Sequence, residues 1–120
     1  MTKSHKVLLI DDEAAIRFSV GSYLEDSGYD VVVASDGEEG LAAFEGAGID
    51  IVVTDARMPK RDGLSVIEEL QEKSPETPII VISGDSTVCA EAMRLGAVRC
   101  MSKPILNLGN LVAAIEHALS

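Results

Sequence analysis

The chain alternates between short apolar runs and longer segments in which apolar residues recur every three or four positions. The apolar runs are KVLLI (6–10), DVVVA (30–34), DIVVT (50–54), PIIVI (78–82) and the weaker RCMS (99–102). Short runs that are rich in Val and Ile, without regular alternation of polar residues, are typical of strands covered on both faces. We therefore predict five strands of a buried parallel sheet.

The segments between these runs carry apolar stripes at helical spacing. The stripes are Ile16, Val20, Tyr23 and Leu24; Leu41 and Phe44; Val66, Ile67 and Leu70; Val88, Ala92 and Leu95; and Leu108, Leu111, Val112, Ile115 and Leu119. The predicted N-caps are Ser35 or Asp36 and Ser86, and the predicted stops are Gly28, Gly46 or Gly48, and Gly96. Five strand–helix repeats predict right-handed crossovers and a three-layer α/β sandwich.

Size and composition limit the protein to a few classes. The 120 residues have the size of one domain, so we expect a single domain over 1–120 with a flexible tail over 1–5. No apolar run approaches the roughly 20 residues that cross a bilayer, and a net charge of -10 argues against direct binding to nucleic acid or anionic membranes. Cys89 and Cys100 lack metal-ligand spacing, and two free thiols filling the core in a reducing cytoplasm are the simplest interpretation.

Polar side chains follow four of the five predicted strands and form one chemical set. In an open parallel sheet the ligand site lies beyond the carboxyl ends of the strands, where the strand order reverses. The residues found there are Asp11, Asp12, Glu13, Asp55, Ser83 and Lys103. The second strand contributes only Ser35 and Asp36, which suits an edge position. Glu13 favours the dipole of the first helical turn more than it favours a metal ion.

Three carboxylates that converge on one crevice are best accommodated around a cation. Mg2+ suits Asp11, Asp12 and Asp55 because a few carboxylates and water complete its octahedral shell. A divalent cation beside a free carboxylate, a hydroxyl and a lysine is an arrangement that handles phosphoryl groups. An aspartate can attack phosphorus, the cation and Lys103 can neutralise the transferred oxygens, and Ser83 can donate a hydrogen bond to one of them.

With these residues in place, the sequence resembles the receiver domain of bacterial two-component response regulators over nearly its whole length. The matching motifs are the acid pair Asp11–Asp12, TDARMPKRDG around Asp55, VISG at Ser83 and SKP at Lys103–Pro104. Each motif alone is weak, but all four occur in order and each stands at a predicted strand end. The resemblance implies a CheY-like, flavodoxin-like α/β fold, with a five-stranded parallel sheet of order 2-1-3-4-5 flanked by five helices.

The resemblance also implies a role for each matching position. Asp55 is the expected phosphoacceptor, phosphorylated by a histidine kinase or a phosphotransfer protein in a Mg2+-dependent reaction. Asp12 is the expected direct metal ligand, Asp11 the water-mediated one, and the backbone carbonyl of Arg57 a further ligand. Ser83 and Lys103 are expected to contact the phosphoryl group.

The residues around these positions carry further expectations. A cis bond before Pro104 is expected to aim Lys103, and Met58–Pro59 and Gly63 to shape the loop after Asp55. Arg57 and Asp85, each two residues past a strand end, are expected to tune the lifetime of the phosphoryl group or to be plain loop charges.

The fifth strand departs from the family pattern at one position, and the stretch from Ser83 to Lys103 is slightly shorter than is common in the family. Receivers usually carry Tyr or Phe in the fifth strand, where this chain has Cys100. That aromatic side chain moves inward during signalling, so a different readout is expected here, routed through residues 84–88. The expected partner is an output domain or a downstream protein, and a homodimer is expected to use the face formed by the fourth helix, the fifth strand and the fifth helix. The domain itself is expected to catalyse only its own phosphorylation and dephosphorylation.

Three other interpretations use the same residues. A Mg2+-dependent phosphohydrolase that forms an aspartyl phosphate normally has a second acid two residues after the nucleophile, where this chain has Arg57. A flavodoxin-like cofactor binder would need Ser, Thr and Gly in the acidic first loop. A pseudo-receiver that acts by protein contact alone would not need Asp55, Ser83 and Lys103.

Overall fold

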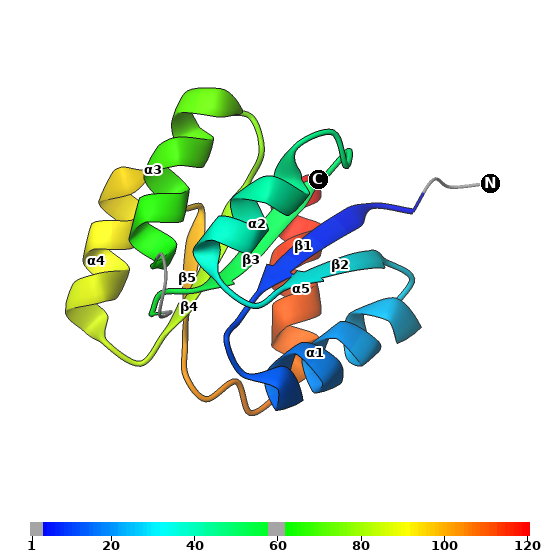
Figure 1. The fold of residues 1–120 in the computed structure, drawn as a ribbon. Coiled ribbons are helices and arrows are strands. Elements are labelled where there is room, and N and C mark those ends of the chain that lie inside the picture. Colours follow the sequence, from blue (N-terminus) through cyan, green and yellow to red (C-terminus); the bar gives the residue numbers. More distant parts are fainter. Residues whose placement is uncertain (1–3, 58–61) are drawn as a thin grey trace.

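The computed structural model describes residues 4–57 and 62–120 as alternating strands and helices (Figure 1). The strands are β1 (Lys6–Ile10), β2 (Asp30–Ala34), β3 (Ile51–Asp55), β4 (Ile79–Ser83) and β5 (Arg99–Ser102). The helices are α1 (Ala14–Asp26), α2 (Gly37–Phe44), α3 (Gly63–Lys73), α4 (Ser86–Leu95) and α5 (Leu108–Leu119). The expected loop residues Met58 and Pro59, and residues 1–3 of the expected tail, lie outside the described part.

All the strand pairs of the sheet are parallel, and the strand order is β2-β1-β3-β4-β5. This order reverses between the neighbouring strands β1 and β3. The chain leads from β1 to β2 on one side of the sheet and from β3 to β4 on the other side. The predicted fold class and the edge position of β2 are confirmed. β3 and β4 each end one residue later than predicted, since Asp55 pairs with Ile82 and Ser83 pairs with Ser102 inside the ladder.

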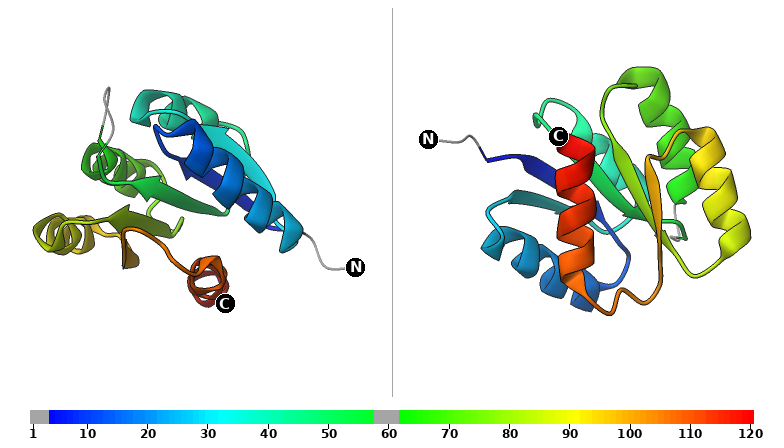
Figure 2. Two further views of the ribbon diagram at one scale, coloured as in Figure 1. Left: turned by 90° about the horizontal axis from the view of Figure 1, so that it is seen from below. Right: turned by 180° about the vertical axis from the view of Figure 1, so that it is seen from behind.

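Two apolar cores cover the two faces of the sheet. Successive side chains of a strand point to opposite faces, so Leu8 and Ile10 belong to one core while Val7 and Leu9 belong to the other. The first core packs under α2, α3 and α4, and the second packs under α1 and α5. α5 accordingly lies behind the sheet in Figure 1 and in front of it in the right view of Figure 2. The carboxyl ends of the strands stay open between these layers.

The helix ends differ from prediction at one point, the N-cap of α4. Asp36 caps α2 as predicted, and its carboxylate accepts a hydrogen bond from the backbone N–H of Glu39. Ser86 is not the cap of α4, because the preceding Asp85 takes that place. Gly96 ends α4 in the left-handed conformation, as predicted. Tyr23 is 40% exposed and therefore stands outside the buried stripe of α1.

The prediction of two free thiols is wrong. Cys89 of α4 and Cys100 of β5 form a disulfide, with their Cα atoms 5.6 Å apart. Both residues are half-buried rather than core fillers, although Cys100 packs at the margin of the core under α4. The two positions become neighbours because α4 folds back along the edge strand, a relationship that their spacing of 11 residues does not reveal. Within residues 4–57 and 62–120, no helix is long and apolar enough to span a membrane.

Candidate functional site

Three aspartates meet at the carboxyl end of the sheet, where the strand order reverses. Asp11 and Asp12 follow β1, and Asp55 is the last residue of β3. Each offers a carboxylate oxygen, and these oxygens lie within 4.8 Å of one another. Asp11 and Asp55 are 2% and 4% exposed, whereas Asp12 is open to solvent. The predicted convergence of the three carboxylates is therefore present in the structure.

Asp11 is held in place by its backbone as well as by its side chain. Its carboxylate Oδ1 accepts a hydrogen bond from the backbone N–H of Glu13 (2.9 Å), and its backbone N–H donates to the Ala34 carbonyl of β2 (3.1 Å). Burial raises the pKa of Asp11, and the nearby charges of Asp55 and Asp12 raise it further against the opposing effects of Glu13 N–H and Lys103. The charged form of Asp11 is therefore costly without a cation.

Lys103 supplies a positive charge beside this cluster. Its Nζ donates a hydrogen bond of 2.7 Å to Asp55 Oδ2, and the two residues are 48 positions apart in sequence. Burial lowers the pKa of Lys103, but the hydrogen bond and charge of Asp55, helped by Asp11 and Glu13, outweigh it and hold the pKa above its ordinary value. The Lys103–Pro104 bond is cis, as expected.

Ser83 lies on the same edge, at the end of β4. Its side chain is buried, and its Oγ accepts a hydrogen bond from the backbone N–H of Asp85 (3.1 Å). Its carbonyl accepts a hydrogen bond from the backbone N–H of Lys103 (3.0 Å). Ser83 thus connects the end of β5, which carries the lysine, to the turn that starts α4.

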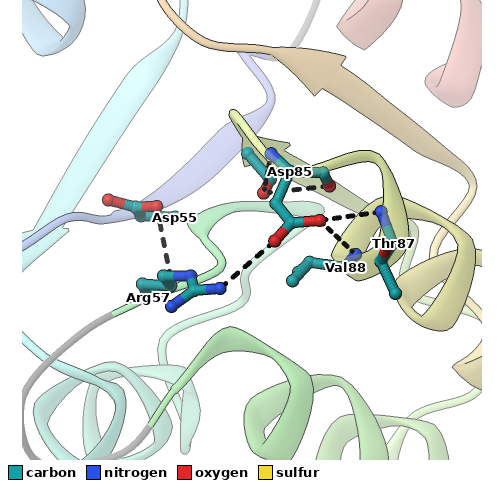
Figure 3. A network of polar contacts seen from close by, with 6 residues as sticks. Asp55, Arg57, Asp85, Thr87 and Val88 are labelled. Carbon is teal, nitrogen blue, oxygen red and sulfur yellow. Dashed lines mark hydrogen bonds and ion pairs between the residues drawn. The ribbon is translucent and has the colours of Figure 1, made fainter.

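Arg57 and Asp85 form an ion pair across the mouth of the site. Figure 3 shows the guanidinium Nη2 of Arg57 directed at Asp85 Oδ2, 3.3 Å away. The backbone N–H of Arg57 also donates to Asp55 Oδ1 (3.3 Å). The other oxygen of Asp85 accepts from Thr87 N–H (2.8 Å) and Val88 N–H (3.3 Å). These backbone hydrogen bonds from α4, together with Arg57, lower the pKa of Asp85.

These side chains line one open cleft of about 490 Å³. Its walls are Asp12, Glu13, Asp55, Arg57, Ser83, Gly84, Asp85 and Lys103. Carboxylate oxygens are hard donors that suit a small divalent cation, so the cluster of Asp11, Asp12 and Asp55 fits a bound metal ion chemically. Cys100, where the sequence predicts a different readout, lies outside this cleft. It is on the edge strand, bonded to α4.

Two contacts at the site were missed by sequence reasoning. Arg17 of α1 donates a hydrogen bond from Nη1 to the backbone carbonyl of Asp11 (2.7 Å), which fixes the acidic turn. The sequence signal for this contact is a basic residue one turn into the helix that follows an acidic strand end. Asp85 links Arg57 to the first turn of α4, a contact that the predicted cap Ser86 does not indicate.

Gly63 packs against the backbone of the site. It is buried at the start of α3, and its N–H donates to the Ala56 carbonyl (2.9 Å). A Cβ at this position would lie only 2.9 Å from the Ala56 Cα and would also collide with the carbonyl oxygen of Asp55. The expected role of Gly63 in shaping this segment therefore has a steric basis.

The same fold occurs in solved receiver structures. A CheY-like response regulator receiver domain protein from Methanospirillum hungatei superposes with a TM-score of 0.92 at 27% identity, covering 98% of this chain and 94% of that one. A receiver domain protein from Clostridium thermocellum superposes with a TM-score of 0.90 at 35% identity, covering 96% and 94%.

Curated relatives match over most of this chain but are longer proteins. The transcriptional regulatory protein FixJ of Bradyrhizobium diazoefficiens is 36% identical over 120 residues, which cover 98% of this chain and 58% of FixJ. The probable transcriptional regulator ycf27 of Guillardia theta is 43% identical over 101 residues, which cover 82% of this chain and 39% of that protein. The chain thus spans about half the length of these relatives. The family model described as response regulator receiver domain matches residues 7–116, and the chain belongs to this family of two-component signalling domains.

Proposed function

We propose that the domain is a phosphorylation-controlled switch that accepts a phosphoryl group on Asp55 from a histidine kinase or a phosphotransfer protein. The observation that carries this proposal is the contact of Asp55 with Lys103 (2.7 Å) inside a cluster of three carboxylates. Such a cluster fits a cation, and a carboxylate placed between a cation and a lysine is suited to receive a phosphoryl group.

In the proposed reaction Asp55 is the nucleophile. A carboxylate oxygen forms a bond to phosphorus while the bond from phosphorus to the donor's histidine nitrogen breaks, and the imidazole leaves with its electron pair. Lys103 neutralises charge on the phosphoryl oxygens, and the N–H of Arg57, which contacts Asp55 Oδ1, orients the carboxylate. The domain catalyses only its own phosphorylation and dephosphorylation.

The proposed cofactor is Mg2+. The side chains that would hold it are Asp11, Asp12 and Asp55, with the backbone carbonyl of Arg57 as a further ligand. When bound, Mg2+ supplies positive charge that stabilises the phosphoryl oxygens during transfer. The raised pKa of Asp11 supports this assignment, because a cation removes the penalty for the charged carboxylate.

The proposed conformational change starts at Ser83. Phosphorylation adds charge and acceptor oxygens at Asp55, and the hydroxyl of Ser83 and the ammonium of Lys103 can donate to them. Ser83 Oγ now contacts the N–H of Asp85, the residue that caps α4. A shift of Ser83 therefore acts on the start of α4 and changes the balance between two arrangements of that helix.

The proposed setting follows from the family. The domain would act in the cytoplasm, where a histidine kinase or a phosphotransfer protein is the donor. An output domain or a downstream protein reads the state of the domain. A homodimer would use the face formed by α4, β5 and α5. The net charge of -10 makes direct contact with nucleic acid or a membrane unfavourable for this segment.

Acetyl phosphate tests the proposal without a kinase. We expect the wild-type chain to gain the mass of one phosphoryl group in the presence of Mg2+, and we expect Asp55→Asn to gain none. A matched variant, Asp62→Asn, changes another aspartate of the same segment that caps α3, and it should be phosphorylated like the wild type. Absence of the increment with every phosphodonor tried would leave a pseudo-receiver as the better description.

A further inference from the structure

The disulfide between Cys89 and Cys100 connects two elements that the proposed switch must move relative to each other. Cys89 lies in α4, which begins three residues after Ser83. Cys100 lies in β5, three residues before Lys103, and pairs with Val81 of β4. The bond therefore ties the segment that leaves Ser83 to the segment that leads to Lys103.

We expect this bond to supply only part of the stability of the fold. It closes a short loop of sequence separation 11, so it constrains the unfolded chain less than a long-range disulfide would. Both faces of the sheet already carry continuous apolar cores. What the bond does constrain is the position of α4 along the edge strand β5, against which this helix packs.

The two sulfur-bearing residues are within reach of small thiols. Both are half-buried, and both line an open groove of about 550 Å³ between α4, β5 and α5. Arg99 and His117 line the same groove, so its polar rim has a basic character that suits an approaching anionic thiolate. In a reducing compartment, disulfides of this kind are usually transient and redox-sensing.

We propose that Cys89 and Cys100 form a reversible thiol–disulfide site that fixes α4 to β5 when oxidised and releases it when reduced. The oxidant is a low-molecular-weight disulfide of the glutathione class. One protein thiolate attacks that disulfide and expels one small thiol, and the second protein thiolate then attacks the mixed disulfide and expels the other. The protein loses two electrons and two protons, and the small disulfide becomes two thiols.

The effect of this disulfide on signalling rests on the proposed function. If phosphorylation of Asp55 acts by shifting α4, a covalent bond from α4 to β5 opposes that shift. The reduced domain is then the responsive form, and the oxidised domain accepts the phosphoryl group without transmitting it. Cys100 occupies the position where an aromatic side chain is usual in the family, so a redox bond stands at the place where the readout is expected.

Hydrogen exchange of α4 tests the site before any phosphodonor is added. The chain is equilibrated in glutathione buffers of graded ratio, and the disulfide is followed by the loss of the mass of two hydrogen atoms. We expect full interconversion without denaturant and roughly tenfold slower exchange of the α4 amides in the oxidised form, because the tether suppresses local opening. Cys89→Ser should exchange like the reduced wild type in every buffer, which controls for effects of glutathione itself.

The outcomes separate this inference from the proposed function. A disulfide that neither forms nor breaks in native buffers, or equal exchange of α4 in both forms, would overturn the redox site. With acetyl phosphate and Mg2+ added, we expect the change in α4 exchange to be several-fold smaller in the oxidised chain than in the reduced chain, and an equal change would overturn the regulatory consequence. Redox-dependent exchange in a chain that takes up no phosphoryl group would support the redox site and contradict the proposed function alone.

Discussion

Lys103 Nζ lies 2.7 Å from Asp55 Oδ2, so the ends of β5 and β3 are joined by an ion pair although β4 separates these strands. Asp55 is 4% exposed, and the ammonium of Lys103 contacts its carboxylate. The ammonium of Lys103 therefore lies where a phosphoryl group on Asp55 would place its negative oxygens.

Replacing Lys103 by Met keeps most of the length of the side chain and removes its charge. We expect the rate of phosphorylation by acetyl phosphate to fall roughly 10- to 1000-fold, as for the loss of one electrostatic contact to a transition state. Lys73→Met is the matched control, because Lys73 pairs with Glu45 and Glu69 far from the site. Equal rates for the two variants, measured by mass spectrometry over time, would contradict the role of Lys103.

Mg2+ should stabilise the folded domain through the three carboxylates. Because only the folded chain brings these oxygens within 4.8 Å, a concentration about 100 times the dissociation constant should add about 2.7 kcal/mol to the free energy of unfolding. We expect Asp12→Asn to lose most of this gain and Glu38→Gln, on the exposed start of α2, to keep it. Thermal unfolding with and without Mg2+ measures both, and an equal gain in the two variants would argue against the site.

The carboxylate of Asp11 should leave a signature in the pH dependence of metal-free stability. Burial raises its pKa, so above that pKa the folded state carries the cost of a charged buried group, and this cost is relieved as the pH falls through the raised value. Below the ordinary value of 3.8 the unfolded state is protonated too, and the gain ends.

Urea unfolding in a chelator, between about pH 7 and about pH 4, measures this contribution. We expect the stability of the wild type relative to Asp11→Asn to rise on acidification over this range. Asp26→Asn, on the exposed end of α1, should show no such difference. A wild type that loses stability relative to Asp11→Asn as the pH falls would contradict the raised pKa.

The sequence predicts the site residues that stand at the carboxyl ends of strands, but it does not predict contacts that depend on how the helices pack. Val and Ile runs located the strands, and the rule that sites lie beyond strand ends located Asp11, Asp12, Asp55, Ser83 and Lys103. That rule does not describe how a helix packs against an edge strand, so it does not predict the pairing of Cys89 with Cys100. It also says nothing about which of two neighbouring polar residues caps α4, a choice decided in favour of Asp85 over Ser86 by local backbone geometry.

The ion pair of Arg57 and Asp85 should affect how long the phosphoryl group survives. Arg57→Ala opens the mouth of the cleft, and we expect loss of the phosphoryl group to become about two- to fivefold faster, since exposed ion pairs couple weakly. Asp85→Asn removes the charge but keeps a good N-cap for α4, so it should have a similar effect without unfolding the helix.

Arg94→Ala serves as the control for this pair, because Arg94 pairs with Glu91 on the exposed side of the same helix. The decay of the phosphorylated form is followed by mass spectrometry. If the double variant Arg57→Ala/Asp85→Asn decays at the product of the two single effects, the pair does not act as a unit and this explanation is wrong.

The same substitution should have opposite effects at two glycines. Gly63→Ala places a methyl group against the backbone of Asp55 and Ala56, and we expect a loss of about 1–3 kcal/mol in the free energy of unfolding. Gly21→Ala, in the middle of α1, meets only Val31 and Val33 side-chain atoms at 3.9 Å. It should gain about 0.5–1 kcal/mol from helix propensity. Urea unfolding checks both signs, and a neutral Gly63→Ala would contradict the close approach.

The most direct test of the central claim maps the phosphorylated residue after transfer from a phosphohistidine donor. Borohydride reduces an acyl phosphate to an alcohol and so marks the modified side chain for peptide mass spectrometry. We predict that the mark appears on Asp55, that it requires Mg2+, and that Asp55→Asn abolishes it. A mark on Asp11 or Asp12 in the wild type, or the same level of marking in the presence of a chelator, would contradict the account.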